Sequence, residues 1–134
     1  MFVKFNFSAI QIKKYYQAAV NDFKIARQSN IPEVIFKFSY DALLKLAIAV
    51  CAKNNLRVKA RQGHHVELIK KLALILNDSD IKVIGDAMRA KRNLDLYSGG
   101  AAITPKEASE YLDWIKDIFE SADEYVATNK KLPV

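Results

Sequence analysis

The segment "ALLKLAIAVCA", residues 42–52, decides the fold of this chain. It is apolar on almost every side of a helix and contains one charged residue, Lys45. A helix of this kind has to be covered on all sides, so it lies either at the centre of a bundle or inside a dimer interface. Its apolar run is too short to cross a membrane. We therefore expect a soluble protein, without a membrane-spanning segment, built around this helix.

The stretches around this segment have the spacing of amphipathic helices. Their apolar residues recur every three or four positions, and most of the four glycines and three prolines fall between them. We expect a first helix after Ser8, whose distance from Gln11 is that of a capping box. A second helix is expected from about Asn30 to Asn54. The basic stretch 56–63 that follows is expected to be a loop.

Three further helices are expected in the second half of the chain. The third begins at "HHVELIKKLALIL", residues 64–76, and the fourth follows the possible capping residues 77–79. The fifth begins at Thr104, which has a glutamate, Glu107, at the capping-box distance. No linker divides residues 1–134. The sequence predicts a single all-α domain, an up-and-down helical bundle of four to five helices.

The charge and the cysteine content suggest a cellular setting and a class of partner. Lysine and arginine outnumber aspartate and glutamate by 21 to 15, a formal net charge of +6. This excess favours polyanionic partners such as RNA, DNA or nucleotides, although ordinary solvated helix faces account for it equally well. The one cysteine, Cys51, is expected to be a buried core residue in a reducing cytoplasm. Residues 1–10 do not have the pattern of a signal peptide.

The segment "RAKRNLDLY", residues 89–97, concentrates the polar chemistry. The donors that share one helix face, at spacing i, i+3 and i+4, are Arg89, Arg92 and Asn93. Two guanidinium groups and an amide suit a phosphate and a base or ribose edge, and Tyr97 lies one turn further. The structural alternative is a basic helix end whose arginines pair with Asp86 and Asp95.

The two histidines, His64 and His65, are adjacent at the expected start of the third helix. Neighbouring helical positions point about 100° apart, so one ring is expected to face inward and the other solvent. They lack the spacing and the further ligand of a zinc site, so no metal and no other cofactor is expected. Beside a bound phosphate, a histidine has the ordinary pKa for acid–base chemistry near neutral pH. Arg61 and its basic neighbours either guide a nucleic-acid backbone or keep the loop soluble.

Four of these segments occur in an order that resembles the HEPN superfamily of small helical domains (higher eukaryote and prokaryote nucleotide-binding). They are "SYDALLKLAIAV" (39–50), "RQGHH" (61–65), "MRAKRNLDLY" (88–97) and "EASEYLDWIKDIFESADEYV" (107–126). In members that cut RNA, an arginine followed by a polar residue, commonly asparagine, lies five positions before a histidine. Two copies of this motif meet across a homodimer and form one metal-independent ribonuclease site.

In this chain Arg92 and Asn93 match the first two positions of that motif, and Tyr97 stands at the histidine position. A phenol with an ordinary pKa near 10 is a poor base at pH 7, so cleavage would need a perturbed Tyr97 or help from a histidine. The resemblance implies a homodimer that binds RNA or a nucleotide, and it leaves open whether the protein is an enzyme. The residues that it implies for the site are Arg89, Arg92, Asn93 and Tyr97, with His64, His65 and Arg61 at the rim.

Two alternatives follow from the same sequence. Relatives with a tyrosine in this motif are frequently encoded beside a minimal nucleotidyltransferase in toxin–antitoxin pairs. The resemblance therefore also implies a non-enzymatic module that binds a protein partner such as a nucleotidyltransferase. A DNA-binding bundle is the weaker alternative, because no short helix-turn-helix with an exposed recognition face is present. The chain also lacks nucleophilic-serine, P-loop and dinucleotide-binding motifs.

Overall fold

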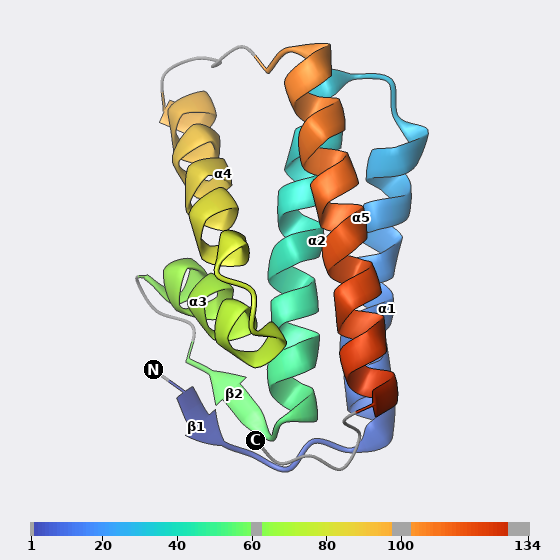
Figure 1. The fold of residues 1–134 in the computed structure, drawn as a ribbon, viewed down its shortest axis with the longest axis vertical. Coiled ribbons are helices and arrows are strands. Elements are labelled where there is room, and N and C mark those ends of the chain that lie inside the picture. Colours follow the sequence, from blue (N-terminus) through green and yellow to red (C-terminus); the bar gives the residue numbers. More distant parts are fainter. Residues whose placement is uncertain (1, 60–62, 98–102, 129–134) are drawn as a thin grey trace.

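The computed structural model describes residues 2–59, 63–97 and 103–128, and in these ranges the protein is an all-α bundle, as the sequence predicts. Its helices are α1 (Ala9–Gln28), α2 (Pro32–Lys53), α3 (His64–Leu76), α4 (Asp80–Tyr97) and α5 (Pro105–Thr128). Figure 1 shows α1, α2 and α5 with nearly parallel axes, and α3 and α4 on the other side of α2. None of the helices in these ranges is long and apolar enough to cross a membrane.

The central helix is α2, which contacts each of the other four helices. All of residues 42–52 are buried except Lys45 and Ile48, which are half-buried. The Nζ atom of Lys45 lies 2.8 Å from Oδ2 of Asp22 on α1, so its charge is paired at the edge of the core. Cys51 is 1% exposed, and burial raises the pKa of its thiol to about 12. The prediction of a buried core cysteine is confirmed.

Capping boxes begin the first and the last helix, as their spacing predicts. The backbone N–H of Gln11 donates to Oγ of Ser8 at 3.1 Å, and the Ser8 N–H donates to Oε1 of Gln11 at 2.9 Å. At α5, the N–H of Glu107 donates to Oγ1 of Thr104 at 3.0 Å, and the Thr104 N–H donates back at 3.2 Å. Each pair satisfies two backbone donors that the helix itself leaves without an acceptor.

The prediction of a loop over residues 56–63 is wrong at its beginning. There, β2 (Leu56–Val58) pairs antiparallel with β1 (Phe2–Lys4), in a register that places Phe2 opposite Val58. The partner strand comes from the first residues of the chain, and three residues are too few to show an alternating pattern. Phe2, Leu56 and Val58 all pack against the core. The two-stranded sheet therefore covers the core at the end of the bundle next to α3 (Figure 1).

Helices α3 and α4 pack closely because α4 has a glycine where the two meet. A Cβ atom added to Gly85 would lie 2.6 Å from Cγ2 of Ile69, whose side chain is fully buried. Asn77, in the left-handed conformation with φ of 54°, ends α3 and lets the chain turn into α4. This packing sets the first turn of α3 and the second half of α4 against the same side of α2.

Candidate functional site

Polar side chains of three helices meet at the first half of α2. The hydroxyl of Tyr40 lies 3.3 Å from Nδ1 of His65, and Cζ of Arg92 lies 5.8 Å from the centroid of the Tyr40 ring. Arg89 is close enough to act on the pKa of both Tyr40 and His65. We refer to this group as the Tyr40 cluster; its members are Tyr40 and Asp41 of α2, His64 and His65 of α3, and Arg89 and Arg92 of α4.

Tyr40 is a fully buried donor at the centre of the cluster. Burial, the largest influence, raises the pKa of its phenol to about 12, against the opposing effect of Arg92 and then Arg89. The hydroxyl therefore keeps its proton at neutral pH. Within the described ranges its one hydrogen-bond partner is Nδ1 of His65. We assign the phenol as the donor and Nδ1 as the acceptor, because a buried hydroxyl proton needs an acceptor. A neutral His65 then carries its own hydrogen on Nε2.

The pKa of His65 lies below its ordinary value. Burial is the main cause, followed by the neighbouring His64 and by Arg92, while Asp41 acts in the opposite direction. His65 is therefore neutral near pH 7 and offers Nε2–H as a donor. An anion bound beside the ring would favour the protonated form and raise this pKa.

The expected separation of the two histidines is not found. Both side chains are half-buried, and their rings meet edge to face with centroids 4.5 Å apart and an interplanar angle of 71°. Their Cβ atoms leave α3 about 100° apart, but the imidazole side chains turn toward each other. His64 therefore lies against His65 in the cluster instead of facing solvent alone.

The structural alternative pairs the arginines with Asp86 and Asp95, and the structure describes only the first of these two side chains. Asp86 pairs with Lys82 at 2.9 Å instead, and in the described part of the chain neither Arg89 nor Arg92 has an ion-pair partner. Nε of Arg89 is buried without a hydrogen-bond partner among these residues. The side chain of Asp95 lies outside the described part. Counting only the described side chains, both guanidinium groups thus retain donors that an anion can satisfy.

The structure describes less of the other predicted site residues. Asn93 is half-buried and directly follows Arg92 on α4. Tyr97 is the last residue of α4, but its side chain lies outside the described part, as does Arg61. Within residues 2–59, 63–97 and 103–128, no group of three or more His, Cys, Asp or Glu side chains is placed to hold a metal ion.

Sequence reasoning missed Tyr40 as a site residue. A tyrosine just before the apolar run 42–52 has the pattern of a core side chain, and its complete burial agrees with that pattern. The signal that would have identified it is the polar tip of the ring, since a buried phenol requires a hydrogen-bond partner.

Comparison of the chain with protein-family models, with curated proteins and with solved structures gives no match.

Proposed function

We propose that this protein is a HEPN-like domain that binds the phosphate of RNA or of a nucleotide at the Tyr40 cluster. The observation that carries the proposal is the pair Arg89 and Arg92, which stand beside a neutral His65 without an ion-pair partner in the described ranges. Guanidinium groups bind phosphate oxygens in a bidentate manner, and Nε2–H of His65 adds a neutral donor. The net charge of +6 also favours a polyanion.

Four side chains in and beside the cluster have separate roles in this proposal. Arg92 holds the phosphate, and its contact with the Tyr40 ring fixes its position. Arg89 adds a second guanidinium group beside the same anion. Tyr40 is a positioning residue, because its hydroxyl holds His65 through Nδ1. Asn93, next along α4, provides the amide for a ribose or base edge.

The hydrogen-bond arrangement favours binding over cleavage. Metal-independent cleavage begins when the ribose 2′-OH loses a proton and attacks the phosphorus, so a base has to accept that proton. With Nδ1 of His65 assigned as the acceptor from Tyr40, the hydrogen of the neutral ring is on Nε2. His65 in this state donates to a phosphate instead of deprotonating a hydroxyl. We therefore propose that the protein is a binding relative of the ribonucleases.

We propose further that the protein is a homodimer and that α4 forms its interface. The apolar surface of α2, on which the expectation of a dimer partly rested, is buried within one chain. On α4, by contrast, Val83 and Leu94 are 68% and 56% exposed, and Ala87 and Ala90 between them are also exposed. These residues recur at spacing four, three and four, which makes one apolar stripe on the helix. A second copy would cover this stripe.

The position of the stripe bears on where the binding sites lie in such a dimer. Arg92 is nine residues, about two and a half turns, from Val83, and so faces the opposite side of α4. A dimer built on the stripe therefore keeps the two Tyr40 clusters apart. We propose one site in each chain, in place of the shared site that the resemblance implies.

A second candidate function is a module that binds a protein partner such as a nucleotidyltransferase. The exposed stripe on α4 favours it, because an apolar helix face of this kind also suits another protein. In this case the stripe holds the partner, and the cationic cluster serves the contact.

The two candidates are separated by one experiment. The purified protein is incubated with single-stranded RNA in EDTA, and binding and cleavage are followed for the wild type and for the double variant Arg89→Ala/Arg92→Ala. Salt-sensitive binding that the double variant loses supports the first candidate. A partner that copurifies while the wild type has no measurable RNA affinity supports the second. RNA binding that the double variant leaves unchanged excludes the Tyr40 cluster.

A further inference from the structure

A pocket lies between α1, α2 and α5, far from the Tyr40 cluster. Its volume is about 370 Å³. Lys53, at the end of α2, lines it and lies thirteen residues from Tyr40, about 20 Å along the helix. Its apolar lining consists of Ala9, Ile12, Ala49, Val50, Ala122 and Val126. The pocket therefore belongs to a different part of the bundle from the proposed RNA site.

The hollow exists because each of the three helices contributes a small side chain to it. Ala9 of α1, Ala49 of α2 and Ala122 of α5 all line the pocket where larger residues would fill it. Ala49 and Ala122 are 3% and 1% exposed, so these methyl groups form its floor. The lining suits an apolar ligand body, and the volume is near the lower end for small-molecule sites. Such a volume fits one short alkyl chain.

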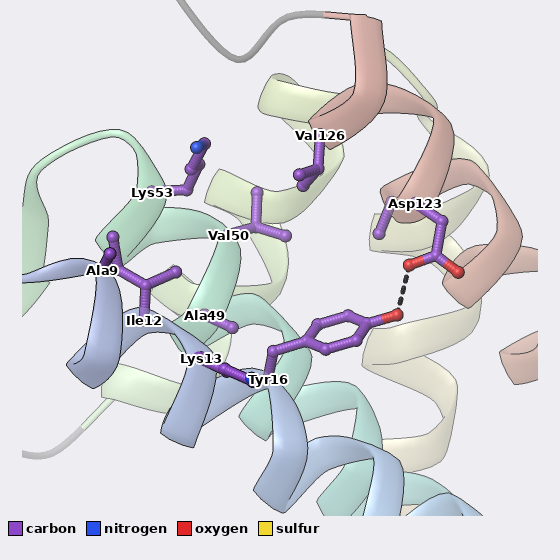
Figure 2. A pocket seen from close by; sticks show the side chains of 10 residues that line it. Ala9, Ile12, Lys13, Tyr16, Ala49, Val50, Lys53, Asp123 and Val126 are labelled. Carbon is purple, nitrogen blue, oxygen red and sulfur yellow. Dashed lines mark hydrogen bonds between the residues drawn. The ribbon is translucent and has the colours of Figure 1, made fainter.

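The charged side chains that line the pocket carry a net positive charge. Lys13 and Lys53 have no ion-pair or hydrogen-bond partner in the described part of the chain. The carboxylate of Asp123, by contrast, accepts a hydrogen bond from the Tyr16 hydroxyl. Burial, followed by this bond, raises the pKa of Tyr16, so the phenol remains a donor. Figure 2 shows the Tyr16–Asp123 bond on one side of the pocket and Lys53 on the other.

We propose that this pocket binds a small amphipathic anion, an aliphatic carboxylate of about the size of decanoate. Its chain lies among the three alanines, and its carboxylate meets Lys53 and Lys13. Two cations against one carboxylate that is already hydrogen-bonded favour an anionic over a cationic head group. The single short cavity selects one chain, so a two-chain phospholipid does not fit.

Calorimetric titration of the protein with decanoate tests the proposal, with decylamine as the ligand of opposite charge. Decanoate is expected to bind at a single site and decylamine to bind at least tenfold more weakly. The variants Lys53→Glu and Lys13→Glu should each weaken decanoate binding by about tenfold, because an attractive charge becomes a repulsive one. Lys14→Glu, one residue away and outside the pocket lining, is the matched control and should bind as the wild type does.

A second variant fills the pocket. Ala49→Phe should abolish decanoate binding, and its thermal unfolding shows whether the chain still folds. Absence of decanoate binding to the wild type, equal binding of decylamine, or equal effects of Lys13→Glu and Lys14→Glu would overturn the proposal. A dimer that Ala49→Phe dissociates would make a second copy the occupant and would also overturn it. Arg92→Ala should bind decanoate normally, so this test is independent of the proposed RNA site.

Discussion

The guanidinium group of Arg92 lies over the ring of Tyr40, with Cζ 5.8 Å from the ring centroid. The same tyrosine holds His65 through its hydroxyl, at 3.3 Å from Nδ1. One buried side chain of α2 therefore sets the position of a cation on α4 and of an imidazole on α3. This arrangement places two kinds of hydrogen-bond donor for phosphate side by side. It also makes the pKa of His65 sensitive to Arg92.

Substitution of Arg92 by glutamine should raise the pKa of His65 toward its ordinary value of 6.5. The positive charge of Arg92 disfavours the protonated imidazole, so its removal favours protonation. Titration of the histidine ring signals by NMR measures the change. Lys70→Gln, an exposed change on α3 that is not among the causes of the shift, is the control. A His65 pKa that is equal in the wild type and Arg92→Gln would show that the two groups do not interact.

The stability of the protein should fall in mild acid because of His65. Its pKa in the folded state lies below 6.5, the ordinary value that the unfolded state has. The stabilising contribution is thus complete above pH 6.5 and is lost as the pH falls through the folded pKa, since the unfolded chain takes up the proton first. Urea unfolding between about pH 7.5 and about pH 5 measures this loss. The free energy of unfolding should change less steeply with pH in His65→Phe. An unchanged pH dependence would assign the loss of stability to other groups.

Much of the fold can be predicted from the sequence because its signals are local. The capping boxes at Ser8 and Thr104 and the all-round apolar face of α2 are patterns within a few turns. The β1–β2 ribbon could not be predicted, because it joins residues more than fifty positions apart through strands of three residues. A strand that short has no periodicity of its own.

Only part of the candidate site could be predicted from the sequence. The spacing of Arg89 and Arg92 predicts one helix face, and the structure places both beside the histidines. Tyr40 escapes this reasoning, because the polar role of a buried tyrosine depends on which side chain of another helix meets its hydroxyl. Likewise, spacing alone does not show that Asp86 pairs with Lys82, one turn away, because another basic side chain, Arg89, lies as near along the helix. Only the packed helices decide between them.

Substitution of Gly85 by alanine should destabilise the protein, although alanine is the better helix former. The added Cβ would lie 2.6 Å from Cγ2 of Ile69, a fully buried branched side chain that cannot move aside freely. The expected loss is about 1–3 kcal/mol of the free energy of unfolding, measured by urea denaturation. In the background Ile69→Ala the same change should cost much less, because the clashing methyl group is gone. A stabilising Gly85→Ala would mean that α3 and α4 are not in close contact there.

Substitution of Val83 by glutamate should convert the proposed dimer into a monomer. The change places a charge in the proposed apolar interface, where it has no partner. Light scattering after size exclusion measures the mass, and Ile10→Glu on α1 is the control, because Ile10 is 70% exposed and Val83 is 68% exposed. Since Arg92 faces the other side of α4, the monomer should still bind RNA. Loss of binding together with the dimer would instead support a site shared between two chains.

Phosphate binding by Arg92 is tested by the affinity of Arg92→Gln for a short single-stranded RNA over a range of salt concentrations. The control is Arg27→Gln, because Arg27 also lies over an aromatic ring, that of Phe23, but on α1 across the bundle (Figure 1). Arg92→Gln should weaken binding by about tenfold or more and lower the salt slope by about one, while Arg27→Gln changes neither. Equal affinities and slopes for the two variants would contradict phosphate binding by Arg92 at the Tyr40 cluster.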